Sequence, residues 1–162
     1  KTALLKLSKM KRVSKHISYK EATHSDTAKK YKIANKPSSE EIENMELLAE
    51  KVFEPLREWV GGPIRINSMF RSLKLNTVLN GAPQSSHMKG QAFDITSMGG
   101  KTNLEMFYYI KSKLSFDQLI WEYGNEPKWL HVSYVNEKEN RNQILVIKRA
   151  GVYRTWSECK NC

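Results

Sequence analysis

The sequence is poor in cysteine and has no long hydrophobic run, and both absences narrow the classes of protein to which it can belong. Its two cysteines, Cys159 and Cys162, lie close to the C-terminus. They are too few for the disulfide-rich scaffolds of small secreted domains, and one C-x-x-C pair is too small for a four-ligand zinc site. We interpret the pair as an inert tail, with redox activity or metal binding as alternatives. Since no run of about 18 apolar residues occurs, we expect no membrane span.

Length and composition indicate one soluble globular domain. A chain of 162 residues fits a single domain with room for a short appendage. Its 40% hydrophobic and 27% charged residues are typical of that class, and we expect a monomer. The sequence shows no signal peptide, because the apolar stretch 3–7 is interrupted by Lys6 and is shorter than the ~7–15 apolar residues of an export signal.

The positive charge is concentrated at one end of the chain. Residues 1–36 contain eleven lysines and arginines against two acidic residues, a net charge of +9, whereas residues 37–162 carry only +1. Such a segment attracts nucleic acid, anionic lipid or anionic cell-wall polymers, and a solubilising tail is the alternative. No aromatic and basic repeat accompanies it, so we expect no specific nucleic-acid binding. His16 and His24 lie in this segment and are interpreted as solvated.

The first clear helix signal follows the basic segment, which itself shows no sustained periodicity. Ser38 or Ser39 can cap a helix, with Glu41 placed as in a capping box. Apolar residues then recur at helical spacing, which predicts a face packed on the core. Pro55 is expected to kink the last turn, and Gly61 with Gly62 to end it. The apolar residues are Ile42, Met45, Leu48, Ala49, Val52, Phe53 and Leu56.

The rest of the chain predicts mostly strands. Two further helices are expected over 71–80 and 103–114, and strands over 64–68, 92–96, 118–123, 129–135 and 144–148. The strands at 118–123 and 129–135 form a hairpin. Because the strands cluster after the helices rather than alternating with them, the pattern favours an α+β fold: a small, mainly antiparallel sheet with helices packed on one side.

Two residues near the middle of the chain form a candidate metal site. His87 and Asp94 are seven residues apart, and Gly90 between them allows a sharp backbone turn. That turn would bring an imidazole and a carboxylate to one point. Asp94 lies in an apolar strand, where an unpaired carboxylate is costly, and a bound metal ion offsets such a cost.

The predicted hairpin supplies two further candidates. Alternation places Trp129, His131 and Ser133 on one face of their strand. If Tyr123 pairs with Leu130, Glu122 lies directly opposite His131, with Cβ atoms about 4.5–5.5 Å apart. Aromatic residues flank this site and either line a groove or pack within the sheet: Trp121, Tyr123, Trp129 and Tyr134.

The four candidate site residues suit hydrolysis by an activated water: His87, Asp94, Glu122 and His131. Two histidines and one aspartate can bind Zn²⁺ with a fourth position open to water, and such an ion lowers the pKa of that water toward neutrality. Glu122 could then accept the proton and pass it to a leaving amine. The alternative is a satisfied core histidine with a structural aspartate.

Beyond these residues, the chain resembles a known family over residues 17–135. It is similar to the zinc D-Ala-D-Ala carboxypeptidases and phage endolysin peptidases of the Hedgehog/DD-peptidase fold. The matching motifs are Ser25-Asp26-Thr27-Ala28, Glu54-Pro55-Leu56-Arg57, Gly62-Pro63-Ile64-Arg65-Ile66-Asn67-Ser68, Phe70-Arg71-Ser72, Leu75-Asn76, Ser85-x-His87-x-x-Gly90-x-Ala92-x-Asp94 and Trp129-x-His131. Two departures are Phe70, where the family often has tyrosine, and Ala82, where it often has glycine.

The resemblance implies Zn²⁺ held by His87, Asp94 and His131, with Glu122 as the catalytic base. It implies that Arg71 stabilises the oxyanion or binds a substrate carboxylate, with Ser85 supporting it. A planar guanidinium suits a carboxylate because it can donate two hydrogen bonds. The implied division of the chain is a basic lead-in over 1–16, a zinc peptidase domain over 17–150 and a tail over 151–162.

The resemblance implies a zinc peptidase that cuts peptidoglycan stem peptides next to a D-amino acid and acts at the bacterial cell wall. A carboxypeptidase of the D-Ala-D-Ala type is the leading hypothesis. A peptidoglycan endopeptidase and a non-catalytic zinc-containing wall-binding module remain as alternatives. The presence of Glu122 argues against the last, because a binding module has no need of a base.

Overall fold

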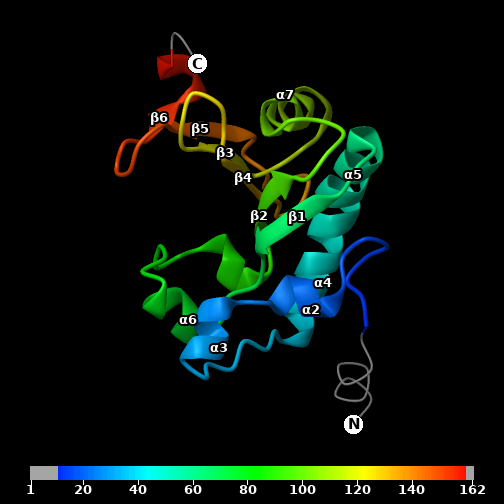
Figure 1. Cartoon of the computed structure of the whole chain (residues 1–162), viewed down its shortest axis with the longest axis vertical. Helices are drawn as coiled ribbons and strands as arrows, with labels where there is room; N and C mark the ends of the chain where they lie inside the picture. The colour runs from blue at the N-terminus through cyan, green and yellow to red at the C-terminus, as the bar shows by residue number, and fades with distance from the viewer. Residues whose placement is uncertain (1–10, 160–162) are drawn as a thin grey trace.

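The computed structural model describes residues 11–159 and follows the chain through short helices into a sheet (Figure 1). The helices are α2 (Tyr19–Thr23), α3 (Asp26–Lys30), α4 (Ser39–Leu48), α5 (Glu54–Val60), α6 (Leu73–Val78) and α7 (Asn103–Lys113). The strands are β1 (Ile64–Ser68), β2 (Ala92–Ser97), β3 (Gln118–Glu122), β4 (Trp129–Ser133), β5 (Gln143–Ile147) and β6 (Arg154–Thr155). Single turns of other helix types are η1 (Ala49–Phe53), η2 (Ser86–Lys89) and η3 (Trp156–Glu158).

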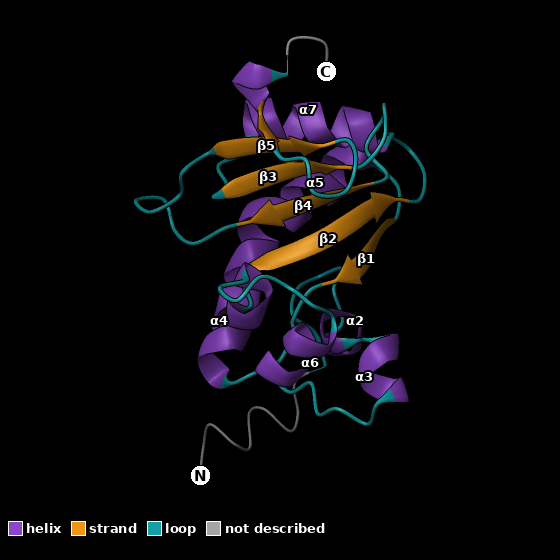
Figure 2. Ribbon diagram, turned by 90° about the vertical axis from the view of Figure 1, so that its left-hand side faces the viewer, coloured by secondary structure: helices purple, strands orange, loops and turns teal. Residues whose placement is uncertain are grey.

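The strands form one six-stranded sheet in the order β1-β2-β4-β3-β5-β6. Within the described residues every neighbouring pair is antiparallel except β3 and β5, which run parallel. Helices α4, α5 and α7 lie against one face of the sheet (Figure 2). The α+β fold with a mainly antiparallel sheet is therefore confirmed. No helix among residues 11–159 is long and apolar enough to span a bilayer.

Helix α4, the turn η1 and helix α5 follow one another over residues 39–60, and we call them the long helical region. This region covers the core in the way that its sequence predicts. Ser38 is the N-cap of α4 and forms a reciprocal capping box with Glu41, and all seven residues of the apolar face are buried. The helix widens into the π-helical turn η1 just before Pro55. Proline has no N–H and clashes with the carbonyl of residue i−4, so the regular hydrogen-bond ladder cannot continue through Pro55. The left-handed Gly61 (φ 67°) ends α5.

The described part of the basic segment contains helices that its lack of periodicity does not indicate. Ser18 and Ser25 cap the two five-residue helices α2 and α3, which are too short to show periodicity. Val13 and Ile17 are buried in the main core. Residues 1–10, which make up most of the predicted basic lead-in, lie outside the described residues.

The described end of the predicted C-terminal tail also contains structure. Strand β6 pairs with β5, and the Trp156 ring packs against Phe107 of α7 at a centroid distance of 5.3 Å. Sequence alone could not place Trp156, because its packing partner lies on a distant helix. Cys162 lies outside the described residues, so our interpretation of the cysteine pair stays a prediction.

Glu54 attaches the N-terminal segment to the long helical region. Its Oε1 accepts hydrogen bonds from the Ser14 hydroxyl (2.6 Å) and the His16 backbone N–H (2.8 Å), and its Oε2 contacts His16 Nδ1 at 2.6 Å. His16 is exposed, as predicted, and it also pairs with Glu54 across the sequence. Burial raises the pKa of Glu54, but these hydrogen bonds and the His16 charge outweigh burial and hold it below its usual range.

A carboxylate whose pKa is lowered on folding stabilises the folded state at neutral pH, and this stabilisation is lost as the pH falls through the lowered pKa. We therefore expect Glu54→Gln to lower the free energy of unfolding by about 1–3 kcal/mol at pH 7. The difference from the parent protein should narrow below about pH 4. Urea unfolding at several pH values measures this, with the exposed Glu58→Gln on the same helix as control. A pH-independent difference would contradict the account.

Candidate metal centre

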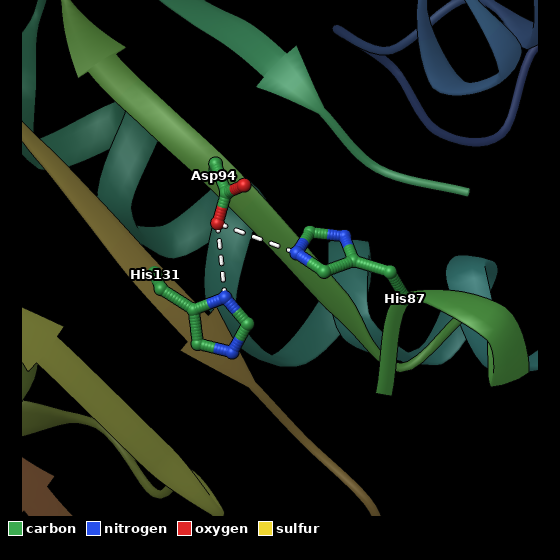
Figure 3. A group of neighbouring side chains, drawn as sticks. All are labelled: His87, Asp94 and His131. Atoms are coloured by element: carbon green, nitrogen blue, oxygen red, sulfur yellow. Dashed lines mark hydrogen bonds and ion pairs between the residues drawn. The ribbon is translucent and has the colours of Figure 1, made fainter. Parts of the chain in front are cut away.

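Two facing strands place Asp94 and His131 on the open side of the sheet. Asp94 of β2 is paired with His131 of β4. Their chain neighbours Phe93, Ile95 and Leu130 are buried on the opposite, core face, because side chains alternate along a strand. The core therefore fixes which face the carboxylate and the imidazole share (Figure 3).

His87 reaches the same point from a loop. It lies in η2, which ends at the left-handed Gly90 (φ 69°). A Cβ at Gly90 would come within 2.3 Å of the Glu41 carbonyl oxygen, so only glycine fits both the conformation and the packing. The predicted role of Gly90 is borne out, since the turn points His87 toward Asp94 (Figure 3).

The three side chains converge on one small volume. Asp94 Oδ1 lies 2.9 Å from His131 Nδ1 and 3.4 Å from His87 Nε2. One ligand atom from each residue lies within 4.8 Å of the other two. A carboxylate and two imidazoles are a donor set that zinc takes in catalytic sites. The residues thus fit a zinc ion.

A second interaction fixes the orientation of His87. Its Nδ1 lies 2.7 Å from the Met69 carbonyl oxygen. A carbonyl accepts but cannot donate, so Nδ1 carries the proton and the Nε2 lone pair faces Asp94. Metal-binding histidines commonly have such a partner on the far nitrogen. The backbone carbonyl of Met69 could not be identified from sequence.

The charge states of the group also suit metal binding. Burial raises the pKa of Asp94, but its interactions with His87 and His131, which include hydrogen bonds, lower it far below its usual range. Burial lowers the pKa of His87, and the neighbouring Asp94 offsets this only in part. A charged carboxylate and a neutral imidazole are the forms in which these side chains bind a metal.

Arg71 borders the group on the side of β1. Its Nη2 donates to Asp94 Oδ2 at 3.2 Å, and its Nε donates to the Ser68 hydroxyl at 3.0 Å. Its backbone N–H donates to the His87 carbonyl at 3.1 Å. Ser68, which sequence analysis did not single out for the site, therefore holds the guanidinium in place.

The predicted role of Ser85 beside Arg71 stays a prediction, and the structure shows a local role for its side chain. It is the N-cap of η2, and its hydroxyl accepts a hydrogen bond from the His87 backbone N–H at 3.3 Å. It thus orients the segment that carries His87. No hydrogen bond joins Ser85 to Arg71 within the described residues.

The hairpin register differs from the predicted one by two residues. Glu122 is paired with Trp129, and His131 with Ile120, so Glu122 does not lie directly opposite His131. The reason is that Tyr123 has a φ of 63°, which ends β3 at Glu122 and starts the turn there. A two-residue shift keeps the faces unchanged, so Glu122 still shares the open face with His131, as a diagonal neighbour.

The Glu122 carboxylate is held in an environment that favours its protonated form. Burial, followed by the charge of Asp94, raises its pKa to about 7, although His131 opposes the change. The carboxylate makes no hydrogen bond to another side chain or to the backbone in residues 11–159. A carboxyl group with a pKa near neutrality can both accept and release a proton at working pH.

The group lies beside a cleft of about 420 Å³ that Arg71, Asp94 and Trp129 help to line. The remaining lining residues are His24, Ser25, Asp26, Thr27, Asn67, Ser68, Leu75 and Leu79. Of the flanking aromatics, Trp129 faces the cleft, whereas Trp121 and Tyr134 are buried. His24, predicted to be solvated, lies 3.2 Å from Asp26 at this cleft.

Comparison with known proteins adds one finding. A family model described as Peptidase M15 matches residues 15–133 of the chain. The matched range includes His87, Asp94, Arg71 and Glu122, and it ends in β4, two residues after His131. No curated protein matches the chain.

Proposed function

The chain belongs to the Peptidase M15 family, whose members are zinc-dependent, and on this premise we propose that it is a peptidoglycan hydrolase of the D-Ala-D-Ala carboxypeptidase type. Family membership supports a zinc metallopeptidase acting on peptidoglycan-type substrates. One observation carries the finer proposal: the cation Arg71, the candidate base Glu122 and the three converging ligands lie at a single face. In this proposal the enzyme acts at the bacterial cell wall.

His87, Asp94 and His131 would hold the zinc ion through Nε2, a carboxylate oxygen and Nδ1. When bound, zinc acts as a Lewis acid that acidifies water and polarises the scissile carbonyl. Glu122, whose carboxylate is free of hydrogen bonds within the described chain, removes a proton from the attacking water and delivers it to the leaving amine. Its position on the open face, rather than among core side chains, leaves it accessible for both transfers.

Arg71 would bind the negatively charged end of the substrate. Its Nε and Nη2 are used by Ser68 and Asp94, which leaves Nη1 without a hydrogen bond in the described chain, and Arg71 lines the cleft. A fixed guanidinium at a half-buried site recognises a terminal carboxylate or stabilises a developing oxyanion. The first role belongs to a carboxypeptidase, and we favour it because the cation is held in one orientation.

Mass spectrometry of digested muropeptides tests this proposal. Incubation of the zinc-loaded protein with soluble pentapeptide stems should remove one terminal alanine and leave stems without a free C-terminal D-Ala-D-Ala unchanged. Release of internal or cross-linked fragments, with no loss of terminal alanine, would instead establish an endopeptidase. Intact muropeptides of every kind would contradict hydrolysis altogether and favour a binding module.

A further inference from the structure

A second groove lies next to the candidate active site. It has a volume of about 500 Å³ and is formed by α2, α3 and the segment 31–36. Its wall includes His24 and Ser25, which also line the catalytic cleft, so the two depressions are adjacent and share part of their walls. Helices α2, α3 and α6 lie together below the β1 end of the sheet in both views (Figures 1 and 2). We call it the lysine groove, after Lys20, Lys29, Lys32 and Lys36 in its wall.

The charges of the lysine groove are not neutralised by the protein. All four lysines are exposed, none forms an ion pair within the described chain, and no acidic residue lines the groove. Of the nearby carboxylates, Glu21 bonds to Ser18 in the α2 capping box, and Asp26 lies 3.2 Å from His24 at the border with the catalytic cleft. Like charges gathered around a concave surface produce a positive potential that attracts anions.

The groove is also rigidly joined to the catalytic cleft. The Asn35 side chain donates to the Thr23 and Phe70 carbonyls and accepts from the Ser72 backbone N–H at 2.7 Å. Phe70 and Ser72 flank Arg71 in the chain. Asn35 therefore links the wall of the lysine groove to the segment that positions the guanidinium.

A small core cluster fixes the same wall. Ile33 packs with Ala28 of α3 and Leu75 of α6, and Leu75 also lines the catalytic cleft. Lys32, with φ 51°, makes the turn after α3 that returns the chain to this cluster, and the Ile33 N–H donates to the Ala28 carbonyl at 2.8 Å. The backbone that carries the lysines is therefore held in place, so their charges stay gathered around the groove.

We propose that the lysine groove binds a second, carboxylate-bearing peptide of the same peptidoglycan strand whose scissile peptide lies in the catalytic cleft. This inference rests on the proposed function. Stem peptides repeat along the polymer and carry free carboxylates, which complement four unpaired ammonium groups. Lysine heads on flexible stems suit carboxylates at varied positions, and about 500 Å³ holds a short peptide. The groove would therefore favour polymeric over isolated substrates, with a preference that added salt weakens.

Binding to insoluble peptidoglycan tests the proposal directly. The probe is purified peptidoglycan stripped of phosphate polymers, and the protein carries Glu122→Gln so that binding is measured without turnover. Adding Lys20→Gln, Lys29→Gln and Lys36→Gln should weaken binding about tenfold at low salt and flatten its salt dependence. Lys32 is left unchanged because of its left-handed backbone. The matched control replaces the exposed Lys51, Lys113 and Lys138, which lie outside the groove, and should bind as the parent does.

Each other outcome overturns a defined part of the proposal. Equal loss in both triple variants would show a general charge effect, and no loss would show that the groove does not bind peptidoglycan. Binding that needs the phosphate polymers, or that persists after the peptide carboxylates are amidated, would overturn the assigned ligand. With Glu122 unchanged, the variant that carries the three groove lysine substitutions should hydrolyse short soluble stems at the parental rate. Absence of hydrolysis by the parent would refute the proposed function and leave the binding assay interpretable.

Discussion

Replacing His131 by alanine is expected to remove zinc from the protein and to reduce hydrolysis of stem peptides by at least about 10³-fold. The ion would lose one of its three protein ligands, and Asp94 would lose its closest partner, 2.9 Å away. Metal analysis should find about one zinc per chain in the parent and far less in the variant, and the reaction rate should fall with the bound metal.

A control separates this effect from loss of the fold. His16→Gln changes a histidine that contacts Glu54 outside the cleft, and it should retain both zinc and activity. Thermal unfolding of the His131 variant shows whether it folds, and His131→Cys, which can still supply a zinc ligand, should recover part of the bound metal. A folded His131→Ala protein with full zinc content would contradict the ligand assignment.

Replacing Glu122 by glutamine is expected to separate metal binding from turnover. Glutamine keeps the size and polarity of the side chain but cannot accept a proton from water. Because Glu122 is outside the group of converging ligands, zinc content and substrate affinity should persist, while kcat falls by about 10²–10⁴-fold. Steady-state kinetics with parallel metal analysis measures the two effects in one preparation.

The neighbouring Glu126 provides the matched control. It is exposed in the turn after β3, so Glu126→Gln changes the net charge equally without altering the open face of the sheet. Its kcat should equal that of the parent. Parental turnover in Glu122→Gln would show that another group acts as base, and loss of zinc together with turnover would place Glu122 among the ligands.

Sequence predicts the parts of this molecule that depend on short-range patterns. The Ser38 capping box needs residues only three positions apart. Alternation predicts that Trp129, His131 and Ser133 share one face of their strand, whereas the pairing of β2 with β4 that brings Asp94 beside His131 is known only from the fold. Arg71 was found through the family resemblance rather than from spacing, since no local pattern distinguishes a cation at a cleft from one at the surface.

Features that depend on the path of the backbone or on distant contacts were not predictable. The hairpin register was wrong because a non-glycine residue, Tyr123, adopts a left-handed conformation, which its side chain does not signal. Asn35 and Glu54 act on partners that only the folded chain brings near. Ser68 lies only three residues before Arg71, but no sequence pattern marks its hydroxyl as the acceptor for the guanidinium. Sequence revealed the excess of positive charge in residues 1–36, but only the fold shows that four of those lysines surround one groove.

The central claim is zinc-dependent hydrolysis of peptidoglycan peptides, and the most direct measurement follows that reaction through removal and return of the metal. Purified protein is incubated with soluble pentapeptide stems as isolated, after chelation, and after addition of one equivalent of zinc. The account predicts loss of terminal alanine in the first sample, none in the second and recovery in the third, with no hydrolysis at any stage by Glu122→Gln. Hydrolysis that continues at full rate in chelated, metal-free protein would contradict it.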